Sequence, residues 1–471
     1  MTHHLFTHRP ELQPGRPERR KPARRSWATM GTAATVLALA AAAGVAATGL
    51  AGSGTAGSGT AGSRGAAAAR SANYSARANG WLDRRPGPSP ASSRSVGRAY
   101  QFLTQMLNLH NPAGTAGLAD LPTLPQSYLG GLPGLAGYTV STIYDDALVI
   151  DAYLAMHTGW GVVRARRIGA GLVRAWAYQH RLFDEYASGD LDDPDDAQTA
   201  DRASNTGDVA WAGLALAQLY AATGITRYRE TAVAIGNWIQ ANCASSRGPG
   251  GYTGGYDPTG NRITWKSTEN NLDVFALFRL LARLTGQDVW QDRAQHARRF
   301  IVAMWHDPPG LFDIGTIANG VTTNDSVQAE DVNSWSYLAL HDHVYAASVG
   351  WDVRNLASDA GRFHGVSVST CDRGGVWFEG TAQLADALEA LGTPDDIRRA
   401  AGYLADIRYA QAHGPGADGR GIMASSEDGL TDCQGNFLYA SLHTGTTAWY
   451  ILAAKAIDPL SAIPLTDQPV R

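Results

Sequence analysis

Carboxylate and aromatic side chains recur along this chain in short clusters, each at the expected start of an apolar helical segment. The clusters are YDDA at Tyr144, GDVAW at Gly207, TENN at Thr268, EDVNSW at Glu330, FEGTA at Phe378 and HTGTTAW at His443. Most neighbouring clusters are about 62 residues apart and one pair is about 48 apart, a spacing typical of repeated supersecondary units. Carboxylates repeated in this way suit reactions in which one group donates a proton and another accepts one.

Hydrolysis of a glycosidic bond needs a carboxylic acid that protonates the leaving oxygen and a second carboxylate that acts as base or nucleophile. We expect Glu269 to be the general acid, and the candidates for the second carboxylate are Asp145, Asp331 and Glu379. A simpler explanation exists for any one of these acids, because acids in a first helical turn cap free N–H groups and complement the helix dipole. Five of six segments with such acids, beside aromatic residues, are harder to explain by capping alone.

The stretch around Glu269 has polar groups at its start and apolar residues behind them. Trp265 and Lys266 precede the glutamate, Asn270 follows it, and a nearly continuous apolar run extends to Gly286. Partial burial would raise the pKa of Glu269 toward that of a general acid, whereas the neighbouring lysine would lower it.

Aromatic residues near the same segment starts suggest a sugar ligand, because an aromatic ring offers an apolar face for stacking on a pyranose. The residues expected to bind substrate are Tyr144, Asp208, Trp211, Trp265, Lys266, Asn270, Trp335, Trp377 and His443. For Trp211, a full turn into its helix, core packing is an equally good explanation.

Helical patterns fill the chain from Ser95 onward, which predicts an all-α protein. The expected helices span roughly 96–109, 144–157, 160–182, 208–223, 225–243, 269–285, 288–305, 331–347, 351–363, 378–391, 394–412 and 444–456. Short and long connections alternate between them. Segment 269–285 is apolar all round, as an inner helix would be, whereas 288–305 is amphipathic, as an outer helix would be. Six inner and six outer helices in alternation predict a ring, with 96–109 as the outer mate of the last helix and all long loops on one rim.

This organisation resembles the six-hairpin, (α/α)6-barrel glycoside hydrolases and their polysaccharide-lyase relatives, over about Ser95 to Pro459. The resemblance implies an (α/α)6 toroid and a secreted glycoside hydrolase that acts on a poly- or oligosaccharide without a cofactor. The pair Asp145-Asp146 is similar to one in bacterial endo-mannanases of this fold. Ala147 and Leu148 follow it here in place of tryptophans, so that activity is not implied.

Two other functions fit the same scaffold. A polysaccharide lyase would need cationic or aromatic groups beside the substrate's carboxylate, and His443, Tyr144 and Lys266 could supply them. A glycan-binding protein without catalysis is also compatible, because a fold does not fix a function.

The N-terminal region has the composition of an export signal and a linker. Arg24-Arg25 precede a weakly apolar run, so residues 1–51 resemble a twin-arginine signal. A membrane anchor is the alternative, although Ala and Gly make the run feebly hydrophobic. Residues 52–94 read as a Gly/Ser/Ala-rich linker, and 95–471 as the catalytic domain. We expect a secreted monomer without stable membrane association once the signal is removed.

Cysteine content and charge limit the remaining possibilities. Three cysteines fit an exported protein with one disulfide, which we expect between Cys371 and Cys433, in long loops before neighbouring inner helices, leaving Cys243 free. No CxxC or HExxH pattern is present, so no metal site is expected. The acid-rich stretch 190–201 reads as a solvated loop. The net charge of −4, without a basic face, argues against nucleic acid as a partner.

Overall fold

The computed structural model describes residues 90–110, 121–132, 137–191 and 199–469. The chain divides into two units, residues 1–36 and 37–471, and all the described residues belong to the second. The predicted signal, nearly all of the predicted linker and most of the acid-rich stretch 190–201 lie outside the described residues. Within the described ranges, no helix combines the length and the apolar character that a membrane span requires.

Twelve α-helices dominate the described residues, which confirms the predicted all-α class. Their bounds are α2 (Pro90–Asn108), α3 (Ile143–Leu154), α4 (Gly159–Gln179), α5 (Thr206–Thr223), α6 (Thr226–Cys243), α7 (Thr268–Thr285), α8 (Asp288–Ala303), α9 (Glu330–Leu340), α10 (Ala346–Asn355), α11 (Phe378–Leu391), α12 (Pro394–His413) and α13 (Thr444–Ala454).

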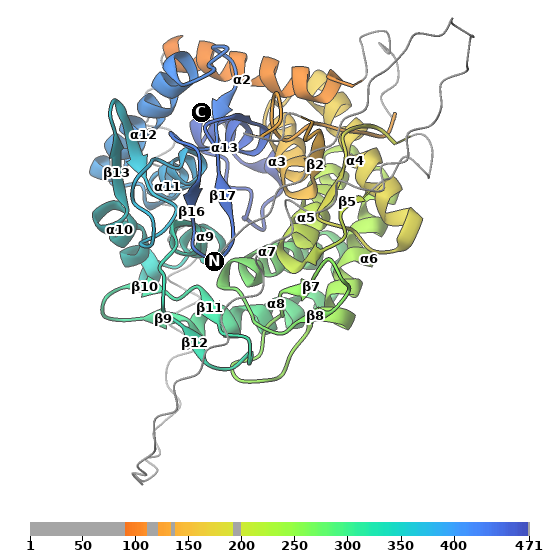
Figure 1. Ribbon diagram of the computed structural model, residues 1–471. Helices are drawn as coiled ribbons and strands as arrows, with labels where there is room; N and C mark the ends of the chain where they lie inside the picture. The colour runs from red at the N-terminus through yellow and green to blue at the C-terminus, as the bar shows by residue number, and fades with distance from the viewer. Residues whose placement is uncertain (1–89, 111–120, 133–136, 192–198, 470–471) are drawn as a thin grey trace, which may run out of the picture. The chain divides into compact units, whose positions relative to one another are not determined.

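The helices form a closed ring of two layers. The inner helices contact one another in the order α3, α5, α7, α9, α11, α13 and back to α3, as the end-on view shows (Figure 1). Each inner helix packs against the outer helix that follows it, and α13 packs against α2. The predicted (α/α)6 toroid is therefore confirmed, including the pairing of the first helix with the last.

Burial distinguishes the two layers as their sequence patterns predict. In the inner helix α5, every residue from Val209 to Leu219 is buried. In the outer helix α8, the buried residues lie on one face, namely Trp290, Ala294, Ala297, Phe300 and Ile301. The core therefore fills both the inside of the inner ring and the space between the layers.

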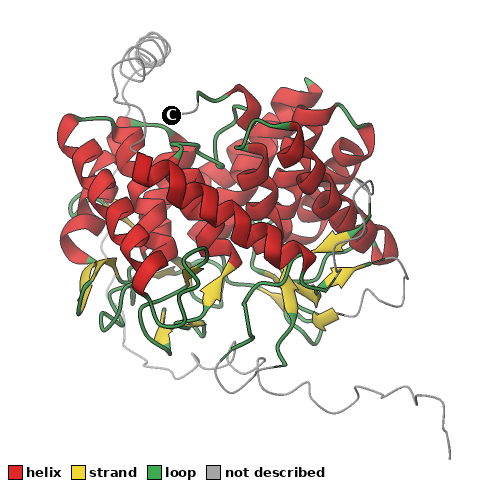
Figure 2. Ribbon diagram, turned by 90° about the horizontal axis from the view of Figure 1, so that it is seen from above, coloured by secondary structure: helices red, strands yellow, loops and turns green. Residues whose placement is uncertain are grey.

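All strands lie in the long connections that run from an outer helix to the next inner helix. They are β1 (Thr123–Leu124), β2 (Val140–Thr142), β3 (Glu185–Ala187), β4 (Gly189–Asp190), β5 (Thr199–Asp201), β6 (Ser204–Asn205), β7 (Gly255–Tyr256), β8 (Arg262–Ile263), β9 (Trp305–His306), β10 (Leu311–Phe312), β11 (Gly315–Thr316), β12 (Thr323–Asn324), β13 (Ala357–Ala360), β14 (Phe363–Val366), β15 (Ile422–Met423), β16 (Leu430–Thr431), β17 (Phe437–Leu438) and β18 (Leu442–His443). They pair in antiparallel sheets of two or three strands, and Figure 2 shows them gathered at one end of the ring.

The opposite rim carries the short connections. Gly224, Gly286 and Gly392 end α5, α7 and α11 in the left-handed conformation, with φ of 68°, 67° and 75°. Glycine adopts this conformation without steric cost, so each chain can turn at once into the next helix. The N-terminal ends of the inner helices consequently share the rim of the long connections.

The sequence pattern misplaces the turn between α9 and α10. It predicts helices over 331–347 and 351–363 with a break at Gly350, but Gly350 lies inside α10. The inner helix instead ends at Leu340, because His341 turns into the left-handed conformation (φ 47°). Residues 357–366 form the β13–β14 hairpin and not a helix.

At the other end of the domain, α2 begins at Pro90, before the predicted boundary at Ser95.

Cys371 and Cys433 form a disulfide, with Cα atoms 6.2 Å apart. Cys243 is the free cysteine and is buried. Thiol titration of the denatured, unreduced protein should therefore find one thiol per chain, and reduction should raise the number to three. Three thiols before reduction would contradict the pairing.

Candidate active site

In three inner helices, the acids of the first turn are not the residues that cap the helix. The caps are the residues just before the helices, Thr142, Asn205 and Ser267, whose side chains accept backbone N–H groups at 3.3, 3.1 and 3.2 Å. Capping therefore does not account for Asp145, Asp208 and Glu269, although these acids still complement the helix dipoles.

Four carboxyl groups from α5, α7 and α9 form what we call the acidic cluster: Asp208, Glu269, Asp273 and Asp331. Burial raises the pKa values of Asp208 and Asp331 to about 7. Burial also raises the pKa of Glu269, and the negative charge of Asp331 is the next largest cause. In Asp273, one turn deeper in α7, burial and then the charge of Asp208 raise the pKa. The cluster thus holds protons at a pH where isolated carboxyl groups would have lost them.

The members of the acidic cluster differ in their access to solvent. Asp208, Glu269 and Asp331 are partly exposed at the helix ends, whereas Asp273 is 1% exposed. The first three can therefore contact a ligand. Asp273 cannot, but its charge raises the pKa of Glu269 from within the core.

His443 joins the other two predicted catalytic acids. Its Nε2 lies 3.2 Å from Asp145 Oδ2, and its Nδ1 lies 3.5 Å from Glu379 Oε2. Burial alone would lower the pKa of His443, but the two carboxylates outweigh burial and raise it to about 10. The Thr446 N–H donates to Nδ1 at 3.2 Å, so His443 also caps α13. His443 therefore links α3, α11 and α13 through Asp145, Glu379 and this cap.

Both oxygens of Glu379 are engaged by neighbouring side chains. Oε1 accepts hydrogen bonds from the Tyr144 hydroxyl at 2.8 Å and from Gln383 Nε2 at 3.4 Å. Oε2 accepts one from the Thr446 hydroxyl at 3.3 Å. The Tyr144 hydroxyl accepts in turn from the indole N–H of Trp449 at 2.8 Å. Tyr144 thus serves to hold Glu379, in addition to any contact with a substrate.

Trp211 and Trp335, expected to stack on a sugar, instead lie in the core. Each is 1% exposed, and Trp449 is fully buried. The three come from α5, α9 and α13, every second inner helix, and their ring centroids lie 5.5 to 6.1 Å apart. Tyr144 meets the edge of Trp211 at 5.5 Å. Because side chains one turn into the inner helices point to the ring axis, these tryptophans pack on one another, and we assign them to the core.

The two tryptophans of the long connections are also packed within the protein. Trp377 is 7% exposed and forms a small apolar cluster with Val368 and Leu430. Trp265 keeps partial exposure, but its ring lies against Gly254, where an added Cβ would come within 2.7 Å of it. Trp265 is therefore the better placed of the two to contact a ligand.

Lys266 and Asn270 flank Glu269 in sequence but serve other contacts. Lys266 is 1% exposed, and its Nζ donates to the Arg247 carbonyl oxygen at 2.6 Å. Asn270 Nδ2 donates to Asn205 Oδ1 at 2.8 Å, which ties α7 to the cap of α5. The largest charge effects on the pKa of Glu269 come from other carboxyl groups, so the expected opposition by Lys266 is not a leading effect.

Two residues that the sequence analysis did not select lie beside these groups. Asp432, next to a disulfide cysteine, is one of the charges that raise the pKa values of Glu269 and Asp331. Tyr128 stacks on His443, with ring centroids 4.3 Å apart and an interplanar angle of 22°. The predicted disulfide was the only signal for Asp432, because it indicates that its loop lies on the rim.

No family model and no curated protein matches the sequence, but solved structures match the fold. A D-mannose isomerase matches with a TM-score of 0.56 at 11% identity, over 80% of this chain and 99% of that one. A family 76 glycoside hydrolase from a bovine Bacteroides thetaiotaomicron strain matches with a TM-score of 0.54 at 13% identity, over 76% and 77%. A sugar epimerase from a ruminal bacterium matches with a TM-score of 0.53 at 11% identity, over 76% and 98%. At these identities the matches show the fold alone, so this chain shares its (α/α)6 toroid with an isomerase, a glycoside hydrolase and an epimerase.

Proposed function

We propose that this protein is a sugar-active enzyme that hydrolyses O-glycosidic bonds in a poly- or oligosaccharide. The observation that carries the proposal is the acidic cluster, in which three neighbouring inner helices each present a partly exposed carboxyl group with a raised pKa. A carboxyl group that keeps its proton near neutral pH can protonate a leaving oxygen, and an ionised neighbour can act as base or nucleophile.

We assign the general acid to Glu269 and the second carboxylate to Asp331. After burial, the charge of Asp331 is the largest cause of the raised pKa of Glu269, so ionisation of Asp331 favours retention of the proton on Glu269. Asp145 and Glu379, the other candidates, are held by His443, which leaves them less available to a substrate. We propose that these two hold His443 and the surrounding inner helices in place and do not carry the chemistry.

A sugar epimerase or isomerase is the second candidate, since proteins so named share this fold. The buried pair of His443 and Asp145 favours it, because proton transfer at carbon needs a base. However, the pKa of His443 is raised to about 10, and an imidazolium cannot accept a proton near neutral pH. A polysaccharide lyase has less support, because the Lys266 ammonium is held by a backbone carbonyl. Hydrolysis therefore ranks first.

A screen that includes polymers and free sugars separates these functions. The purified protein should release new reducing ends from a neutral polysaccharide, without the ultraviolet absorbance of an unsaturated uronate. That absorbance would identify a lyase, and interconversion of free sugars would identify an epimerase or isomerase. Binding without turnover on the whole panel would identify a glycan-binding protein and reject catalysis.

We also propose that residues 1–51 export the chain, which would bring a monomeric enzyme to a polysaccharide outside the cell. The paired arginines followed by a weakly apolar run support this proposal. Expression of the full chain in a bacterium with a twin-arginine pathway, followed by N-terminal sequencing of protein from the medium, tests it. Full-length protein retained in the membrane fraction would contradict it.

A further inference from the structure

The connection between α12 and α13 carries a hairpin near the ring axis. Strands β16 and β17 pair in antiparallel fashion, with Leu430 opposite Leu438 and Thr431 opposite Phe437. Seen end-on in Figure 1, both strands lie inside the outline of the ring of inner helices. We call residues 430–438 the strap.

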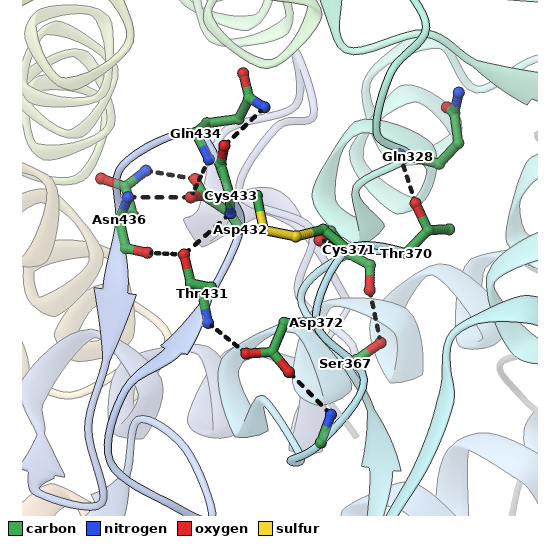
Figure 3. The surroundings of a disulfide bond; sticks show 12 residues. Gln328, Ser367, Thr370, Cys371, Asp372, Thr431, Asp432, Cys433, Gln434 and Asn436 are labelled. Carbon is green, nitrogen blue, oxygen red and sulfur yellow. Dashed lines mark hydrogen bonds between the residues drawn. A yellow bond between two sulfur atoms is a disulfide. The ribbon is translucent and has the colours of Figure 1, made fainter. Parts of the chain in front are cut away.

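The strap is fastened to the α10–α11 connection. At its tip, Cys433 is disulfide-bonded to Cys371, and the Thr431 N–H donates to Asp372 Oδ2 at 3.2 Å (Figure 3). At its base, the leucines of the strap pack with Trp377. The disulfide therefore fixes the part of the strap that a short hairpin alone would leave mobile.

Asp432 lies at the tip, next to the disulfide. Its Oδ1 accepts the backbone N–H groups of Gln434 and Asn436 at 2.8 and 3.0 Å, and its Oδ2 accepts Asn436 Nδ2 at 2.7 Å (Figure 3). These three hydrogen bonds fix the direction of the Asp432 carboxylate. Thr370, next to Cys371, exchanges two hydrogen bonds with Gln328, just before α9: its N–H donates to the Gln328 carbonyl at 2.9 Å, and the Gln328 N–H donates to its hydroxyl at 3.1 Å. The disulfide therefore places the tip of the strap beside the start of α9, which carries Asp331, and the charge of Asp432 raises the pKa values of Asp331 and Glu269.

We propose that Asp432 is a positioning residue for the proposed hydrolysis, held beside Glu269 and Asp331 by the Cys371–Cys433 disulfide. Three more negative groups, Asp208, Asp273 and Glu379, are among the largest charge effects on this pair. An additional negative charge disfavours loss of a proton from the pair, so the strap raises the pH at which the general acid loses its proton. Release of the strap would let this charge move away.

The proposal rests on the proposed function for its catalytic meaning, but its effect on the carboxyl groups can be measured without a substrate. Carbon NMR of protein labelled at the aspartate carboxyl carbons follows their titration, and the signal missing in Asp331→Asn identifies Asp331. Its midpoint should fall by about 0.5 to 1 unit in Asp432→Asn, because one partly screened like charge is removed. Asp432→Glu keeps the charge and should restore most of the shift.

Two further variants make the test specific. Asp428→Asn removes an exposed charge from the same connection and should leave the midpoint unchanged. The double variant Cys371→Ser, Cys433→Ser keeps Asp432 but frees the tip, and should lower the midpoint in the same direction. An unchanged midpoint in Asp432→Asn, or an equal shift in Asp428→Asn, overturns the role of Asp432. An unchanged midpoint in the double serine variant overturns the role of the disulfide.

Activity then provides a separate readout. Asp331 must be ionised to act, so the acidic limb of the kcat/KM profile should move to lower pH in Asp432→Asn by the amount of the NMR shift. Glu269 must be protonated to act, so the alkaline limb should also move to lower pH. A shifted midpoint in a protein that hydrolyses no glycan would uphold the strap as an electrostatic device and reject the proposed hydrolysis. A shifted midpoint with an unmoved profile would instead remove the Glu269–Asp331 pair from the reaction, and with it the positioning role.

Discussion

Glu269→Gln should lower kcat on the natural polysaccharide by at least about 100-fold, the lower end of what general acid catalysis contributes. Glutamine keeps the size and the hydrogen-bonding capacity of glutamate, but it has no proton to give to the leaving oxygen. Steady-state kinetics on the polysaccharide identified by the screen measure the effect. Because the change removes an interaction made mainly in the transition state, kcat and kcat/KM should fall together.

Two controls show whether the loss belongs to the proposed chemistry. Glu230→Gln makes the same change on the exposed face of the outer helix α6 and should keep kcat. In Glu269→Gln itself, a synthetic glycoside with a good leaving group should lose far less activity, because its departure needs little protonation. Near-wild-type turnover of the polysaccharide by Glu269→Gln would contradict the assignment.

Asp331→Asn should stabilise the protein above neutral pH while it abolishes activity. In the folded state the pKa of Asp331 is raised from 3.8 to about 7, so the folded protein binds the proton more tightly than the unfolded chain. The free energy of unfolding therefore falls as pH rises between about 4 and 7, and the full cost remains above pH 7. Each pKa unit corresponds to about 1.4 kcal/mol. For a partly exposed group in a coupled cluster we expect a gain of about 1–3 kcal/mol from asparagine.

Thermal unfolding at a fixed scan rate, at about pH 5 and about pH 8, measures this difference. The advantage of Asp331→Asn over wild type should be smaller at the lower pH, where less than half of the cost has developed, and rise by a few degrees at the higher pH. Asp325→Asn, an exposed aspartate of the connection before α9, should show no such growth. A constant difference at both pH values would mean that Asp331 is not held protonated by the fold.

The ring and its acidic rim could be predicted from the sequence because both follow from local patterns. A helix that is apolar all round, such as Thr268–Thr285, has to be inner, and acids such as Glu269 and Asp331 mark where inner helices begin. The alternation of short and long connections then determines which rim carries these acids. None of this needs a contact between residues distant in sequence.

The partners of those acids could not be predicted in the same way. The contact between His443 and Asp145 joins the last helix to the first inner helix, and only closure of the ring brings them together. The position of Asp432 depends on where the long connection between α12 and α13 folds back, and no periodicity in the sequence indicates this point. The same limit applies to Trp335 within its helix. The sequence pattern around it does not show whether its side chain lies at the rim or packs at the axis of the ring.

The buried tryptophans of α5, α9 and α13 also determine how a polymer can move through this molecule. Because rings from alternate inner helices close the axis, with Tyr144 beside them, the toroid is plugged and cannot be threaded. On the proposed function, a glycan would therefore bind and leave at the rim of the long connections. A polymer could lie across this rim, but it could not pass along the axis of the ring, so product would be released on the side that carries the strap.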